Sequence, residues 1–297
     1  MFVIAGATGN TGSIVASTLL AQGKPVRALV RNPEKATRLR AAGAELTVAD
    51  LGDTPALTRA LTGATAAYLL LPPTPTSNDV VGDQARTAVS LAAAVKASGV
   101  PHVVLLSSIG AHLASGNGPI KTLHHAEGLL RETGATVTAV RANYFMENWG
   151  GALGAVAQGI LPTFFREGLA VGSIATRDIG AAAAGALIEG GRGFQIIDLA
   201  GPRDLTGAEV AAIVSGLVGK PIAPVYAPLD AVVPTFTGFG LSENYARLFV
   251  EMYAGFNSGQ VTVESGAGRL VRGKTPIEDV LRPMLSGTSA NAAHLTP

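Results

Sequence analysis

The stretch FVIAGATGNTG (residues 2–12) decides the fold, because a short apolar strand runs directly into a glycine-rich turn and a helix. Gly6, Gly9 and Gly12 lie at that junction, and SIVASTLLAQG follows as the helix. Glycines permit a tight turn and a close backbone approach, and the first turn of a helix offers free N–H groups to phosphate oxygens. The stretch therefore predicts a binding site for the pyrophosphate of a dinucleotide.

Short β-branched runs alternate with longer helical patterns through the first half of the chain. The runs expected as strands are 2–7, 25–31, 44–50, 66–72, 102–109 and 136–143. The helices expected between them are 11–22, 33–42, 55–61, 79–98 and 120–133. This alternation is typical of βαβ units, and the nearly continuous apolar strands suit a sheet covered on both faces. The prediction is an α/β fold with a doubly wound parallel sheet of the Rossmann type.

The pattern loosens after residue 150, where glycine, proline and aromatic residues become frequent. A strand over 196–202 and a helix over 206–219 are still expected. We predict a dinucleotide-binding domain over 1–150 and a smaller substrate-capping region over 151–285, with some segments returning to the sheet. Residues 286–297 are predicted to form a disordered tail.

Composition excludes several classes of protein. The chain of 297 residues is 47% hydrophobic and carries a net charge of +1, so direct binding of nucleic acid is not expected. The longest apolar run, IGAAAAGALI (179–188), is shorter than the roughly 20 residues that a membrane-spanning helix needs, so no membrane contact is expected. The start MFVIAGATGN lacks a basic signal-peptide region, and the chain contains no cysteine. A cytoplasmic protein is expected.

The end of the second strand indicates which dinucleotide binds. An acidic residue there would repel a 2′-phosphate, but VRALVRNP (26–33) places Arg31 at this point. A guanidinium can pair with phosphate and stack on adenine, which favours NADP(H) over NAD(H). Asp50, at the end of the third strand, could accept a hydrogen bond from the adenine amino group or cap the next helix.

The motifs GATGNTG, VRNPEKA and LLSSIG resemble those of the atypical short-chain dehydrogenase/reductases, and the likeness is strongest to their NmrA-like branch. It continues in VRANYFMENW (140–149), TRDIGAAAAGALIEG (176–190) and LAGPRDLTGAEVAAIVSGLVGKPI (199–222). That branch includes NADPH-dependent quinone reductases and proteins that bind NADP without turnover.

The resemblance implies a set of cofactor contacts at the carboxyl ends of the strands, where an open α/β sheet binds its ligand. The pyrophosphate would be surrounded by Gly6, Thr8, Gly9, Asn10, Thr11 and Gly12, and the 2′-phosphate would be held by Arg31. Adenine would lie near Asp50 and Leu51, and the ribose would be lined by Leu71 and Pro72. The nicotinamide would have Ser107 and Ser108 beneath it, and its other side would be closed by Asn143, Tyr144 and Phe145.

The Tyr-x-x-x-Lys dyad of the wider family is absent. No tyrosine is followed by lysine four positions later; the residues found there are Pro72, Asn148, Asp230, Phe249 and Asn257. The helix that should carry the dyad contains IKTLHHAEGLL (120–130), with His124 and His125 adjacent. Adjacent helical residues point about 100° apart, so at most one of the two faces the nicotinamide.

Three interpretations of the histidine pair stay open: acid–base work at the nicotinamide, a hydrogen bond to the ribose, or a solvated helix flank. A metal site is not expected, because the His-x-x-x-His spacing is lacking and no cysteine is present.

Aromatic residues on the Gly/Pro-rich segments are expected to line a substrate pocket. The candidates are Phe145, Trp149, Phe164, Phe236 and Phe239. The predicted function is NADPH-dependent reduction of a small apolar quinone or enone. The alternative is a non-catalytic NADP(H) redox sensor with a regulatory protein partner, and a homodimer is also considered.

Overall fold

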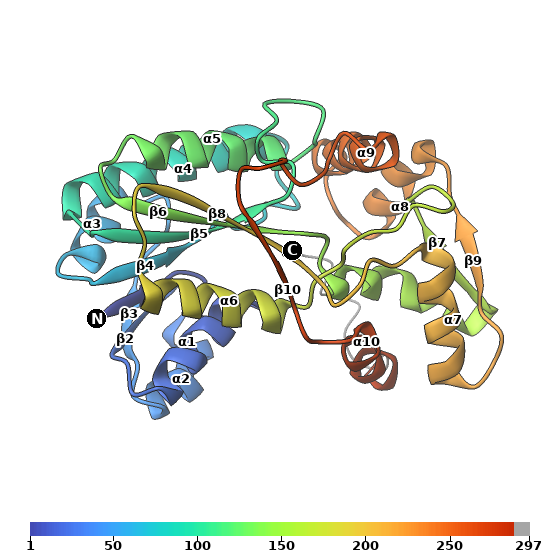
Figure 1. The fold of residues 1–297 in the computed structure, drawn as a ribbon, viewed down its shortest axis with the longest axis horizontal. Helices are drawn as coiled ribbons and strands as arrows, with labels where there is room; N and C mark the ends of the chain where they lie inside the picture. The colour runs from blue at the N-terminus through green and yellow to red at the C-terminus, as the bar shows by residue number, and fades with distance from the viewer. Residues whose placement is uncertain (288–297) are drawn as a thin grey trace.

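The computed structural model describes residues 1–287, and residues 288–297 of the predicted tail lie outside this range. An eight-stranded sheet has the order β10-β8-β6-β5-β4-β1-β2-β3, and every neighbouring pair is parallel (Figure 1). Its strands are β1 (Phe2–Ile4), β2 (Val26–Val30), β3 (Glu45–Val48), β4 (Ala66–Leu69), β5 (His102–Ser108), β6 (Thr136–Ala142), β8 (Phe194–Ala200) and β10 (Arg269–Arg272). The predicted doubly wound α/β fold is confirmed.

Helices cover both faces of this sheet (Figure 1). On one face lie α1 (Gly12–Ala21), η1 (Pro33–Ala36), α2 (Thr37–Ala41) and α6 (Thr176–Glu189), and on the other lie α3 (Thr54–Leu61), α4 (Val80–Ser98) and α5 (Ile120–Arg131). The helix predicted over 33–42 is thus a 3-10 turn followed by a short α-helix.

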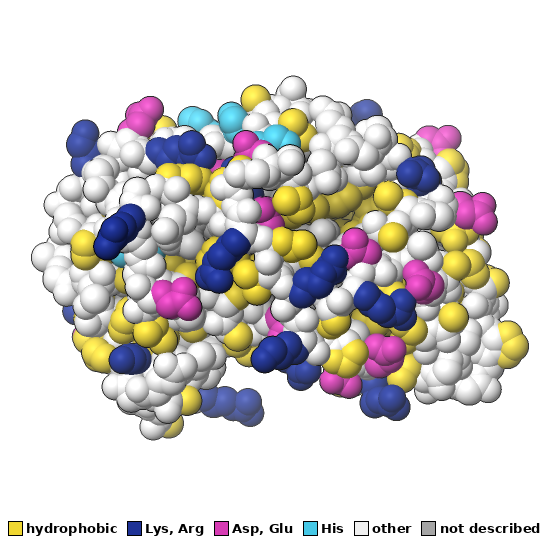
Figure 2. All heavy atoms as spheres, viewed as in Figure 1, with side chains coloured by type: hydrophobic (Ala, Val, Ile, Leu, Met, Phe, Trp, Pro, Cys, Tyr) yellow, Lys and Arg dark blue, Asp and Glu magenta, His cyan; other side chains and the backbone are white. Residues whose placement is uncertain are grey.

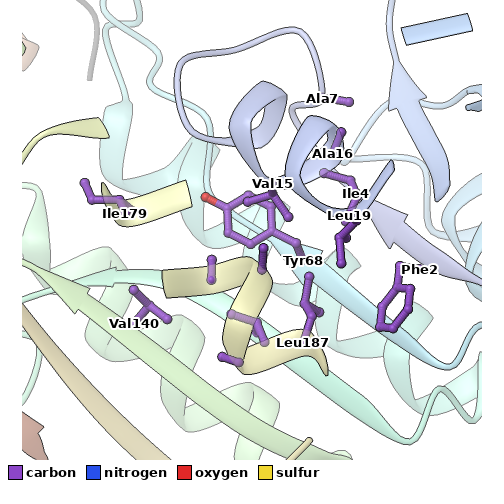
Figure 3. Close-up of a cluster of buried hydrophobic side chains, with 14 of the residues drawn as sticks. Phe2, Ile4, Ala7, Val15, Ala16, Leu19, Tyr68, Val140, Ile179 and Leu187 are labelled. Atoms are coloured by element: carbon purple, nitrogen blue, oxygen red, sulfur yellow. The ribbon is translucent and has the colours of Figure 1, made fainter. Parts of the chain in front are cut away.

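Small residues let α6 approach α1 closely. A Cβ atom at Gly180 would lie 2.5 Å from the Cβ of Ile14, so a larger side chain would force the helices apart. Val15 and Leu19 from α1, and Ile179 and Leu187 from α6, bury their side chains around Tyr68 (Figure 3). This core joins the first βαβ unit to a helix far along the chain.

The rest of the chain forms a second layer of structure beyond the carboxyl ends of the strands, which we call the C-terminal lobe. It contains η2 (Met146–Gln158), β7 (Ile160–Thr163), α7 (Gly207–Val218), β9 (Ala223–Tyr226), η3 (Leu229–Ala231), α8 (Val232–Gly238), α9 (Glu243–Ser258) and α10 (Ile277–Ser286). β7 and β9 pair in parallel as a small sheet, and the lobe has its own hydrophobic core. Of these elements the sequence predicted only α7.

Candidate functional site

The loop between β1 and α1 closes on itself so tightly that only glycine fits at two positions. Gly6 has a φ of 60°, and a Cβ atom there would lie 2.8 Å from Cδ2 of Leu70. A Cβ atom at Gly12 would lie 2.3 Å from the carbonyl oxygen of Gly6. The Gly9 N–H donates to that same oxygen at 2.8 Å. The result is a backbone cradle that a phosphate group can approach, as a dinucleotide site needs.

Thr11 anchors this loop from beneath. Its side chain is buried, and its hydroxyl accepts a hydrogen bond of 2.8 Å from the Tyr68 hydroxyl at the end of β4. Burial raises the pKa of Tyr68, so this phenol stays protonated and keeps donating. Thr8, Gly9 and Asn10 are exposed. The loop therefore divides into residues that can meet a ligand and one that fixes their position.

A cavity of about 360 Å³ lies between the loop and the C-terminal lobe. It is lined by Thr8, Gly9, Asn10, Ser13, Phe145, Glu147, Asn148, Thr176 and Met284. Five of these residues, Ser13, Glu147, Asn148, Thr176 and Met284, were not predicted from the sequence, although Glu147, Asn148 and Thr176 belong to motifs that it singled out.

Glu147 ties this cavity to α6. Its Oε1 accepts hydrogen bonds from the backbone N–H and the hydroxyl of Thr176, at 2.9 and 2.6 Å, at the first turn of that helix. A larger hollow of about 650 Å³ lies at the amino end of β8, between Phe194 and Arg269, and contains none of the predicted site residues. The smaller cavity is therefore the candidate for the cofactor.

The predicted adenine and ribose residues lie after β2, β3 and β4. Arg31 is exposed directly after β2, and no hydrogen bond or ion pair of its side chain is found within residues 1–287. Asp50 caps its own turn, because Oδ1 accepts from the N–H of Gly52 at 2.7 Å. Asp53 caps α3 instead. Leu51, Leu71 and Pro72 are half-buried.

The paired serines at the end of β5 face opposite sides of the sheet. Ser107 is buried, and its hydroxyl donates to Oε1 of Glu127 at 2.6 Å. Ser108 is half-buried and donates to the carbonyl of Ile109. Of the two, only Ser108 has a side chain that is accessible to a ligand.

The histidine pair lies near the start of α5, on its outer side. Nδ1 of His124 is 2.9 Å from the carbonyl oxygen of Ala111, so Nδ1 carries the hydrogen and Nε2 of the neutral ring has none. His125 is exposed. Residues Ile120, Ala126, Glu127 and Leu130 occupy the buried face of the helix. Within residues 1–287 no group of histidine and acidic side chains could hold a metal ion.

Residues 143–149 separate the cofactor cavity from a cluster of aromatic rings. Phe145 and Asn148 line the cavity, whereas Tyr144 and Trp149 turn into the C-terminal lobe. The rings in contact there are Tyr144, Trp149, Phe164, Phe165, Phe236, Tyr245, Phe249, Tyr253 and Phe256. Phe239 is 53% exposed and makes none of these contacts. The cluster is apolar and uncharged, and it adjoins the cavity through one short segment.

Comparisons with known proteins identify several reductases that are similar to this chain. The chain is 33% identical over 260 residues to an NAD(P)H azoreductase of Xenophilus azovorans, covering 86% of each chain. It is 29% identical over 262 residues to quinone oxidoreductase 2 of Escherichia coli, covering 87% of this chain and 89% of that protein. The crystal structure of the E. coli NADPH-dependent quinone oxidoreductase with NADPH superposes with a TM-score of 0.80 at 27% identity, over 96% of this chain and 99% of that one.

The parallel sheet, the glycine cradle and these relatives define the class: a Rossmann-type NADP(H)-dependent oxidoreductase. Within that class, the model of the NmrA-like family matches residues 1–278. The chain belongs to the NmrA-like family. Among residues 1–287 no helix is long and apolar enough to span a membrane.

Proposed function

We propose that this protein reduces a small apolar quinone or enone with NADPH, without a Tyr-x-x-x-Lys dyad. The observation that carries the proposal is the uncharged aromatic cluster, which adjoins the cofactor cavity through Tyr144, Phe145 and Trp149. A planar apolar molecule would bury its faces against these rings, whereas a phosphorylated or polyanionic substrate would find no charged partner among them. The quinone and azo reductases among the relatives support the same chemistry.

The residues of the nucleotide loop fit NADPH, and they would hold its pyrophosphate through backbone N–H groups. Thr8, Gly9 and Asn10 would meet the pyrophosphate, and Arg31 would pair with the 2′-phosphate. The bound cofactor supplies a hydride, which delivers two electrons to the substrate. The protein has then to bind and orient the substrate, exclude water and provide one proton.

The test is to mix the purified protein with NADPH and a panel of quinones and enones, and to follow NADPH absorbance. We expect saturable oxidation with at least one apolar quinone, and none with phosphorylated analogues. Background oxidation across the whole panel would count decisively against the proposal. The regulatory alternative instead requires different affinities for NADP⁺ and NADPH and a protein partner, which calorimetry and pull-down would reveal.

A further inference from the structure

Two tyrosines meet inside the aromatic cluster. The hydroxyl oxygens of Tyr144, just after β6, and Tyr253, on α9, lie 3.2 Å apart and share a hydrogen bond. Tyr253 is buried, and the ring of Phe165 contacts both tyrosines, with centroid distances of 5.0 Å to Tyr144 and 5.3 Å to Tyr253. Tyr144 is half-buried and precedes Phe145, which lines the cofactor cavity. Tyr144 thus belongs to the segment between the cofactor cavity and the aromatic cluster, and Tyr253 meets it from α9.

A pair of hydroxyl groups has one more O–H donor than its shared hydrogen bond uses. Two hydroxyl groups that share one hydrogen bond use one O–H as the donor, and the second O–H stays available. No acceptor for this second hydrogen is found within residues 1–287. Nε1 of Trp149, whose ring centroid is 6.4 Å from that of Tyr144, is also buried without a partner in the same range. Unused donors in an apolar cluster suit a ligand that carries acceptor oxygens.

We propose that the Tyr144–Tyr253 pair donates the proton that a carbonyl oxygen of the substrate takes up, in place of the missing dyad. The inference rests on the proposed function. The substrate gains a hydride, an O–H bond of the pair breaks, and a new O–H bond forms on the substrate oxygen. The phenolate then recovers a proton from water, so that quinone, NADPH and one proton give hydroquinone and NADP⁺.

The surroundings keep the pair in its donating form. Burial raises the pKa of Tyr144 to about 12, and burial and Tyr144 together raise that of Tyr253 well above its ordinary value. Within residues 1–287, Tyr245 is the other titratable group that interacts electrostatically with the pair. When one phenol gives up its proton, the second donates a hydrogen bond to the phenolate and offsets part of the cost of burying that charge.

The experiment compares Tyr144→Phe, Tyr253→Phe and the double variant with Tyr226→Phe. The control removes the hydroxyl of a half-buried tyrosine at the end of β9, in the same lobe but outside the aromatic cluster. Trp149 is the single tryptophan of the chain, so quenching of its fluorescence by 2-methyl-1,4-naphthoquinone, with NADP⁺ present, reports binding independently of turnover. Steady-state oxidation of NADPH with the same quinone then gives kcat and KM.

We expect each pair variant to bind the quinone with little change and to lose about tenfold or more in kcat, because general acid catalysis contributes factors of this order. Between about pH 6 and pH 9, kcat of the unaltered protein should be constant. In the variants, kcat should fall as pH rises, because the proton must then come from the solvent. The double variant should be no slower than either single variant, since the pair acts as a unit.

Three results would overturn the inference. One is unchanged kcat and pH dependence in both single variants, and another is an equal loss in Tyr226→Phe. The third is loss of Trp149 quenching in the pair variants, which would assign the hydroxyls to binding. Failure of the proposed function would give a different result. The unaltered protein would then neither oxidise NADPH nor show quenching with any quinone, which would contradict both the quinone reduction and the role of the tyrosine pair.

Discussion

At the scale of single residues, the nucleotide loop depends on the absence of a side chain at position 12. The nearest atoms to an added Cβ are the carbonyl groups of Gly6 and Ala5, at 2.3 to 2.8 Å. All of them belong to the backbone, so no rotamer change can relieve the clash. The strand, the turn and the helix start must all move together if Gly12 changes.

We expect Gly12→Ala to abolish measurable NADPH binding and to destabilise the fold by about 1–3 kcal/mol, which is typical of overpacking. Calorimetric titration and urea unfolding measure the two effects. Gly216→Ala is the matched control, because this exposed glycine of α7 has no atom within 4 Å of the added Cβ. That variant should bind NADPH normally and gain up to about 1 kcal/mol from helix propensity. Normal NADPH affinity in Gly12→Ala would contradict the assignment of this backbone loop as the pyrophosphate site.

Arg31 is the residue predicted to distinguish the two dinucleotides. We expect Arg31→Gln to weaken NADPH binding at least about tenfold, because a charge-assisted contact with the 2′-phosphate is lost. NADH, which lacks that phosphate, is the internal control and should bind the variant and the unaltered protein alike. Equal losses for both dinucleotides, measured by calorimetry, would show that Arg31 acts in some other way.

At the scale of elements, a buried polar network crosses three neighbouring strands. Ser107 of β5, Arg141 of β6 and Asp198 of β8 are register partners. Arg141 donates to Glu127 at 3.0 and 2.7 Å and to Glu264 at 2.6 Å. Both carboxylate oxygens of Asp198 are buried, and no partner for them is found within residues 1–287. Three acidic groups thus surround one guanidinium, and the network binds α5 and the segment before β10 to the sheet.

This arrangement predicts a pH-dependent stability. Burial raises the pKa of Asp198, Glu264 and Glu127 raise it further, and Arg141 opposes them. A carboxyl with a raised pKa binds more protons in the folded state, so its contribution to stability falls as pH rises through that pKa. We expect Asp198→Asn to equal the unaltered protein near about pH 4 and to be the more stable of the two at about pH 7.

Urea unfolding at both pH values measures this difference in the free energy of unfolding. Asp230→Asn, which changes an exposed carboxylate, should shift stability equally at the two pH values. A difference for Asp198→Asn that stays constant with pH would contradict the raised pKa.

At the scale of the whole molecule, the chain leaves the sheet after β6 to form η2 and β7, and returns through α6 and β8 (Figure 1). It leaves again to form the lobe from α7 to α9, and returns through β10 before ending in α10. On the face shown in Figure 2, hydrophobic side chains gather in a hollow beside α9, and charged side chains of both signs are interspersed around it. The segment between β10 and α10 is held by Asp178 of α6, which accepts hydrogen bonds from the N–H groups of Lys274 and Thr275 at 3.0 and 2.9 Å. This contact places α10, whose Met284 lines the cofactor cavity.

We expect Asp178→Ala to leave these N–H groups unsatisfied, to destabilise the fold by about 1–3 kcal/mol, and to weaken NADPH binding several-fold. Hydrogen exchange should quicken over residues 269–286. Asp279→Ala is the control, because Asp279 makes a surface ion pair of 3.4 Å with Arg177, and such pairs contribute at most about 1 kcal/mol. Unchanged NADPH affinity in Asp178→Ala would show that the position of α10 does not affect cofactor binding.

The sequence predicted what local patterns encode. The alternation of strands and helices up to residue 150 and the glycine turn at 6–12 follow from periodicities and turn chemistry that span a few residues. These patterns were sufficient for the doubly wound sheet, which the structure confirms. They were too weak for β10, whose four residues (RLVR) carry no alternation, and for most of the C-terminal lobe.

Only the tertiary structure brought together groups that are distant in sequence. Tyr144 and Tyr253 are 109 positions apart, and Arg141 and Glu264 are 123 apart. No periodicity in the intervening chain relates such partners, because their contact depends on how the lobe packs against the sheet. The sequence by itself determined a Rossmann-type sheet with a dinucleotide loop and the absence of the family dyad. Packing alone decided that Thr11 faces inward, that His124 is bound to a loop carbonyl, and that two phenols meet inside the aromatic cluster.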